Sequence, residues 1–141
     1  MNRTIKFRAL NTKTKRMLDC YKSTPLAVHP DLLKEGLDGV FIPFHKDLII
    51  EQFTGLLDKS GMEIYEGDFL KSYQFTDRKK RKHYLYHSVV WSHKYSGWHV
   101  CAQGEEHKPE EDRQGSGPLW VYLKNSPDAI VGGNIHEGVE Q

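Results

Sequence analysis

A run of five consecutive cations between aromatic residues is the part of this sequence best suited to bind a ligand. The cations are Arg78, Lys79, Lys80, Arg81 and Lys82, and the flanking aromatic residues are Tyr73, Phe75, Tyr84 and Tyr86. Cations neutralise phosphates, and aromatic rings stack on unpaired bases. The cations together with Tyr84 and Tyr86 therefore form a candidate nucleic-acid site. The ordinary alternative, which we favour from the sequence alone, is a solvated hairpin tip whose like charges prevent pairing between strand edges.

Histidine and cysteine spacing gives weaker evidence for a metal site. His83, His87, His93, His99 and Cys101 all have odd numbers, and side chains two residues apart share one face of a strand. However, no pair among them has the close spacing of a structural zinc motif, and Gly97 is expected to turn the chain before His99. We therefore predict no metal ligand and no cofactor.

Three carboxylates, Glu63, Glu66 and Asp68, could converge for acid-base chemistry. A structural role is the stronger interpretation, because Asp beside Gly commonly hydrogen-bonds its own backbone to close a turn. The sequence contains no Gly-X-Ser-X-Gly elbow, phosphate-binding loop, dinucleotide fingerprint or His-Glu-X-X-His motif. We therefore assign no catalytic residue and do not predict an enzyme.

Length and charge limit the class of protein. A chain of 141 residues can form one domain or two small ones with a core of its own. Its formal net charge of +1 argues against bulk cationic binding, although a local basic patch is compatible with it. Cys20 and Cys101 lie far apart, which is typical of a reducing compartment. With no apolar signal or membrane-spanning run, the cytoplasm is the expected location.

The elements that would position these side chains are mostly short β-strands. Asp58 to Gly61 has the composition of a tight turn and predicts a β-hairpin in residues 53–68. A second hairpin is predicted from residues 5–10 and 17–21. Further strands are expected at residues 40–44, 48–53, 68–75, 84–92, 98–102, 119–123 and 129–135. One short helix is expected between Pro30 and Gly36. This pattern predicts an antiparallel all-β domain of barrel or sandwich type.

Residues 103–117 are acidic, polar and rich in glycine, with no apolar periodicity, and we expect a mobile surface loop there. Gly132 and Gly133 interrupt the last strand and predict a bulge or sharp bend. We divide the chain into an N-terminal hairpin and short helix (1–50) and a β-rich core (51–141), which could also form one continuous domain.

The residues around the central turn resemble the signature of the YopX family of phage and prophage proteins. Phe53-Thr54-Gly55-Leu56 leads through Lys59-Ser60-Gly61 into Glu63-Ile64-Tyr65-Glu66-Gly67-Asp68. Similar anchors follow the family order at Lys6-Phe7-Arg8-Ala9, Val89-Val90-Trp91 and Ile130-Val131-Gly132-Gly133-Asn134-Ile135-His136-Glu137. Leu10 stands where a Trp is usual, a second Gly alters the closing Gly-Asn pattern, and His136 replaces the usual Tyr. These departures affect local packing more than membership.

The resemblance implies a phage or prophage origin, a small Src-homology-type barrel with extra hairpins and little helix, and self-assembly. It supplies no catalytic residue. We interpret the signature as structural, since turns and burial account for its residues. These residues are Thr54, Gly55, Gly61, Tyr65, Glu66, Gly67 and Asp68. The leading hypothesis is a non-enzymatic, self-assembling binding protein in the host cytoplasm, and the alternative is a nucleic-acid-binding accessory factor that uses residues 78–82.

Overall fold

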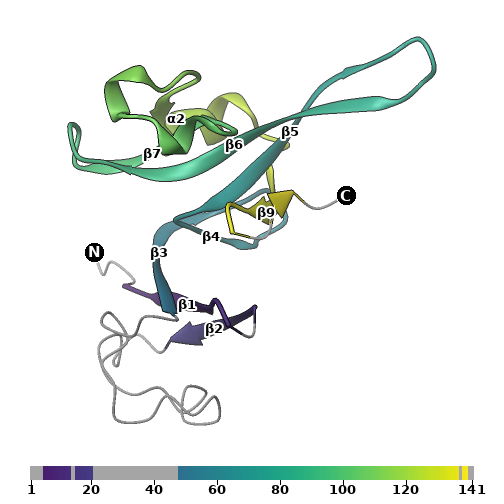
Figure 1. Cartoon of the computed structure of the whole chain (residues 1–141). Coiled ribbons are helices and arrows are strands. Elements are labelled where there is room, and N and C mark those ends of the chain that lie inside the picture. Colours follow the sequence, from purple (N-terminus) through teal and green to yellow (C-terminus); the bar gives the residue numbers. More distant parts are fainter. Residues whose placement is uncertain (1–4, 14, 21–47, 137, 140–141) are drawn as a thin grey trace, which may run out of the picture. The chain divides into compact units, whose positions relative to one another are not determined.

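The computed structural model describes residues 5–13, 15–20, 48–136 and 138–139 (Figure 1). The chain forms two compact units, residues 1–55 and 56–141. The helix expected between Pro30 and Gly36 and the strand expected at 40–44 lie outside the described residues. Within the described ranges, no helix is long and apolar enough to cross a membrane.

The first unit contains the predicted N-terminal hairpin. β1 (Phe7–Asn11) pairs antiparallel with β2 (Arg16–Cys20) on one side and with β3 (Leu48–Leu57) on the other. The side chain of Asn11 accepts a hydrogen bond from the backbone amide of Lys13 at 3.0 Å, which is how an Asn starts a turn. Arg8 and Glu51 face each other across β1 and β3, with a guanidinium nitrogen 2.9 Å from the buried carboxylate.

The second unit is built on a six-stranded antiparallel sheet in the order β10-β9-β5-β6-β7-β8. The strands are β5 (Asp68–Thr76), β6 (Lys82–Ser92), β7 (Gly97–Ala102), β8 (Gly117–Pro118), β9 (Ile130–Asn134) and β10 (Gly138–Val139). β4 (Glu63–Tyr65) pairs with β3, so the predicted central hairpin is confirmed. The β5–β9 register shifts between Asp68 and Leu70, where β9 carries one extra residue. The predicted glycine bulge is therefore present in β9.

The core of this unit lies on one face of the sheet. Ile64, Leu70, Val89, Val100 and Leu119 are buried together, and Tyr122 and Leu123 pack against them. The last three belong to helix α2 (Leu119–Asn125), so the strand predicted at 119–123 is wrong. Positions 119, 122 and 123 have helical spacing, and burying that stripe overrides the β propensity of the aromatic and branched residues.

The two sheets formed by the described strands are open. Each sheet of the described residues has two end strands: β2 and β4 in the four-stranded sheet, and β10 and β8 in the six-stranded sheet. A barrel requires the end strands to pair with each other. The fold is therefore mainly antiparallel β with open sheets, and the expected barrel is not found among the described strands.

Residues 103–117 have more regular structure than the sequence suggested. They contain two 3₁₀ helices, η2 (Glu105–His107) and η3 (Glu110–Asp112). The buried carboxylate of Glu106 accepts hydrogen bonds from the Ser88 hydroxyl at 3.0 Å and the Gly104 amide at 2.8 Å. Glu110 accepts a hydrogen bond from the His93 amide at 3.0 Å. Carboxylate hydrogen bonds to β6 and to the β6–β7 turn therefore hold this segment, which has no periodic apolar face.

Candidate nucleic-acid interface

The basic run lies at the tip of a two-stranded ribbon formed by β5 and β6. β9 pairs with β5 only as far as Lys71, and β7 pairs with β6 only as far as His87. Beyond these points residues 72–76 and 82–85 pair only with each other among the described strands. The ribbon is the long teal hairpin at the upper right of Figure 1. We call residues 72–86 the β5–β6 ribbon, and residues 77–82 its tip.

Asp77 organises the tip. One of its carboxylate oxygens accepts hydrogen bonds from the backbone amides of Lys79 (2.8 Å) and Arg81 (2.9 Å). The other oxygen lies 2.9 Å from both the Arg81 Nε and the His83 Nε2. These contacts, with His83 the largest contributor, lower the pKa of Asp77 from 3.8 to about 2. Asp77 therefore stays ionised and fixes the turn at neutral pH.

The remaining cations of the tip are available to a ligand. Arg78, Lys79, Lys80 and Lys82 are exposed. Of the five cations, only Arg81 forms an ion pair within the part of the chain that the structure describes. Residues 72–86 carry five Lys or Arg residues and one carboxylate. The ribbon is therefore strongly basic, although the net charge of the whole chain is only +1.

Aromatic side chains occupy both faces of the ribbon. The Tyr73 and Tyr84 rings meet edge to face at 6.4 Å, and the Lys71 ammonium lies 4.1 Å from the Tyr84 ring centre. Phe75 stacks on His83 at 4.5 Å. Because neighbouring side chains in a strand point to opposite faces, His83 and Tyr84 place these two pairs on opposite faces.

A bulge in β5 places these two aromatic pairs on opposite faces of the ribbon. The register passes from Tyr73 opposite Tyr84 to Phe75 opposite His83, so Gln74 is an extra residue in β5. Sequence reasoning placed Tyr73 and Phe75 in one group because they are two residues apart, and it had no signal for the bulge. Tyr73, Phe75 and Tyr84 are exposed, whereas Tyr86 is half-buried. Of the predicted binding aromatics, Tyr84 is the more accessible.

The signature carboxylates lie outside the ribbon. Asp68 is buried and accepts a hydrogen bond from the Tyr65 amide at 2.8 Å. Glu63 and Glu66 are half-buried. The sequence singled out these three acids but not Asp58, whose carboxylate accepts hydrogen bonds from the amides of Ser60 (2.8 Å), Met62 (2.9 Å) and Val131 (2.8 Å). Burial opposes its ionisation, but a hydrogen bond from the Ser60 hydroxyl (2.7 Å) and these amide hydrogen bonds lower the pKa of Asp58 overall.

The histidines take separate positions. His83 lies on the ribbon, His87 packs against Tyr122, and His99 stacks on Tyr95. Burial lowers the pKa of His87, and it also lowers that of His99 although Glu110 acts in the opposite direction. Across the described ranges no three His, Cys, Asp or Glu side chains are grouped so that they could hold a metal ion.

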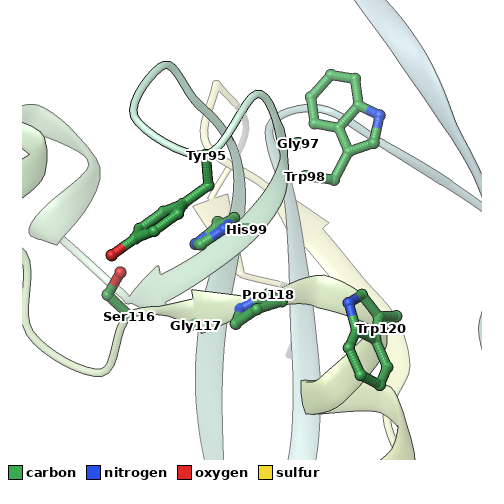
Figure 2. Close-up of a pocket in the computed structure, with 8 residues that line it drawn as sticks. All are labelled: Tyr95, Gly97, Trp98, His99, Ser116, Gly117, Pro118 and Trp120. Carbon is green, nitrogen blue, oxygen red and sulfur yellow. The ribbon is translucent and has the colours of Figure 1, made fainter.

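A hollow lies near the other end of β6, away from the ribbon tip, and we call it the aromatic pocket. It has a volume of about 500 Å³. Figure 2 shows Tyr95 stacked over His99, with Trp120 across the hollow and Pro118 between them. The Tyr95 and Trp120 side chains are 64% and 63% exposed. Sequence reasoning missed this site because its residues come from the β6–β7 turn, β7, β8 and α2.

Comparison with known proteins gives a family and a fold. A family model described as "YopX protein" matches residues 6–140. The crystal structure of protein EF1440 from Enterococcus faecalis is similar to this chain, with 22% sequence identity, 94% coverage of each chain and a TM-score of 0.53. No curated protein matches the chain.

Proposed function

The chain belongs to the YopX family, and we propose that it acts by binding, with the β5–β6 ribbon as a site for nucleic acid. Exposed cations at the tip together with exposed aromatic rings on the ribbon carry this proposal. Phosphates would contact Arg78, Lys79, Lys80 and Lys82. Bases would stack on Tyr84 or on the Phe75 ring.

Single-stranded nucleic acid is the proposed ligand class, because ring faces stack on bases that are unpaired. A two-stranded ribbon also fits the major groove of duplex DNA, where cations contact phosphates and side chains read base edges. The two classes differ in what the aromatic residues contribute. Replacement of Tyr84 should weaken single-strand binding strongly and duplex binding little.

Fluorescence anisotropy with labelled, mixed-sequence single-stranded DNA and RNA tests the proposal. Four cations on phosphates predict that affinity falls about 50-fold between roughly 50 and 200 mM salt. The double variant Lys79→Glu/Lys80→Glu should bind weakly and reduce the slope of log K against log salt by about 1.4. Tyr84→Ala should lower affinity by roughly 5- to 150-fold, the equivalent of about 1–3 kcal/mol of stacking, with the slope unchanged.

Lys59→Glu/Lys124→Glu is the matched control, since both lysines are exposed in the same unit and outside the ribbon. It changes the net charge by the same amount and should leave most of the affinity intact. If the control weakens binding as much as the tip variant, the attraction is general and the ribbon is not the site. If wild-type protein binds neither single-stranded DNA nor single-stranded RNA at low salt, the proposal is wrong.

Self-association is a second proposed function, and the aromatic pocket favours it. Two large aromatic side chains on a monomer surface, each more than 60% exposed, are typical of surfaces that another chain covers. Size-exclusion chromatography with light scattering tests this directly, because a monomeric mass at all concentrations would exclude it. Both functions are proposed for a phage-encoded protein in the bacterial cytoplasm, supported by the family resemblance and the two widely spaced cysteines.

A further inference from the structure

The aromatic pocket has room for a long side chain. Tyr95 enters it from the β6–β7 turn and stacks on His99 with ring centres 5.3 Å apart and the rings 4° from parallel. Pro118 lies opposite His99 in the β7–β8 pairing, and Trp120 lies on the side of the pocket away from Tyr95 (Figure 2). A smaller hollow shares Tyr95 and His99 with the pocket, and its lining adds two carboxylates, Glu110 and Glu111, and two cations, Lys94 and Arg113. The combined surface offers aromatic faces beside side chains of both charges.

This surface suits a cation. The chain's own Lys94 places its ammonium 5.2 Å from the Tyr95 ring centre, which is the geometry of a cation–π contact. Glu111, which lines the smaller hollow, and the next residue, Asp112, are exposed, and neither has an ion pair within the described ranges. Residues 103–117 contain five carboxylates and two Lys or Arg residues. An additional positive side chain would therefore be attracted both by the rings and by the acidic segment.

The ribbon tip has the complementary chemistry, but it cannot reach the pocket of its own chain. The tip ends at Lys82, the first residue of β6, and the β6–β7 turn follows Ser92, the last residue of β6. Ten steps along an extended strand separate them by about 33 Å. A basic tip that enters this pocket must therefore come from another molecule.

We propose that the tip of one copy docks in the aromatic pocket of a second copy, with Arg78, Lys79 or Lys80 between the aromatic rings and close to Glu111 and Asp112. This inference rests on the proposed self-association and names the surfaces that make it. The two surfaces differ, so the contact is head to tail. Repetition of the contact yields a closed ring or an extended chain of molecules.

A charge-exchange experiment tests the contact. The tip variant is Lys79→Glu/Lys80→Glu, and the pocket variant is Glu111→Lys/Asp112→Lys. Wild-type protein, freed of nucleic acid by nuclease and high salt, should form multimers at low salt that dissociate as salt is added. Each variant alone should be monomeric, with at least a tenfold higher dissociation constant. An equimolar mixture of the two should assemble again, because each tip then meets a pocket of opposite charge.

Two further variants sharpen the result. Lys94→Glu removes the cation that already lies on Tyr95, so it should strengthen assembly at least twofold. Lys59→Glu/Lys124→Glu should leave the mass of the multimer unchanged. Acrylamide should quench tryptophan fluorescence less in the multimer than in the monomer, because Trp120 becomes covered, and Trp120→Phe should remove that difference.

The possible results separate the two proposals. If wild-type multimers persist in both charge variants and in high salt, self-association holds but uses another surface, and the tip-to-pocket contact is wrong. If wild-type protein is monomeric at every concentration and salt, self-association and this contact both fail. Recovery in the mixture but in neither variant alone would support the contact, since a general loss of folding cannot produce it.

Discussion

Gly61 and Lys80 occupy the same position in two copies of one hairpin turn. Their backbone amides each donate to the carbonyl of an aspartate three residues earlier, Asp58 or Asp77, at 3.0 Å. In each turn the aspartate carboxylate accepts from the amides two and four residues later. The φ angle is +87° at Gly61 and +61° at Lys80. The same geometry is therefore made once with glycine and once with a side chain that resists it.

Lys80→Gly is expected to raise the free energy of unfolding by about 0.5–1 kcal/mol, because relief of the left-handed conformation exceeds the entropy cost of glycine. Gly61→Ala should lower it by about 1–2 kcal/mol. A Cβ at Gly61 would meet no atom within 4 Å, so this loss comes from the backbone alone. Urea unfolding monitored by circular dichroism measures both changes. Lys80→Ala is the control, since it removes the same charge but keeps the Cβ, and equal effects of Ala and Gly would refute the explanation.

Asp58 and Asp77 should differ in what their loss costs, although they make the same turn. Asp58 is buried and also binds the Val131 amide in β9, whereas Asp77 lies on the projecting ribbon. Asp58→Ala would leave these amides without an acceptor and should lower the free energy of unfolding by about 1–3 kcal/mol. Asp77→Ala should lower it less, because water reaches the amides of the tip. Urea unfolding of the two variants side by side tests the order, and a larger loss for Asp77→Ala would contradict it.

The tip should loosen only in strong acid. The pKa of Asp77 in the folded chain is lowered from 3.8 to about 2, so the stabilisation it provides is complete above pH 3.8 and disappears as the pH falls through about 2. The amide shifts of Lys79 and Arg81, followed by NMR between about pH 5 and 1.5, report this titration. His83→Gln should raise the midpoint, because the hydrogen bond from His83 is the largest contribution. A wild-type midpoint near 3.8 would show that the tip contacts do not form in solution.

The elements that can be predicted from the sequence are those that a local residue pattern determines. The Asp58–Gly61 turn was found because Gly marks a positive φ, and the β5–β6 pair was found from β-rich runs on either side of a charged segment. The identical turn at Asp77 carries no such marker, because Lys80 stands where the first turn has Gly61. Composition could therefore locate the tip but not its internal geometry.

The errors arose where contacts distant in sequence decide the structure. Leu119, Tyr122 and Leu123 read as a strand by propensity, yet their spacing fits a helix that covers the sheet. The Gln74 bulge, which separates Phe75 from Tyr73, has no marker in the sequence. Tyr95 and Trp120 both line the aromatic pocket although they lie 25 residues apart in the sequence. Hydrophobic periodicity describes single elements and therefore cannot predict such a contact surface.

Glu106 should be the anchor that gives residues 103–117 their structure. Its carboxylate is 8% exposed and binds the Ser88 hydroxyl and the Gly104 amide. Glu106→Ala should lower the free energy of unfolding by about 1–3 kcal/mol and speed hydrogen exchange at the Gly104 amide. Glu111→Ala removes an exposed carboxylate of the same segment and should do neither. If both variants behave alike, the segment does not depend on this buried contact. If only Glu106→Ala loosens it, the Glu106 contact to β6 is needed, in addition to the Glu110 contact, to hold the segment beside the aromatic pocket in place.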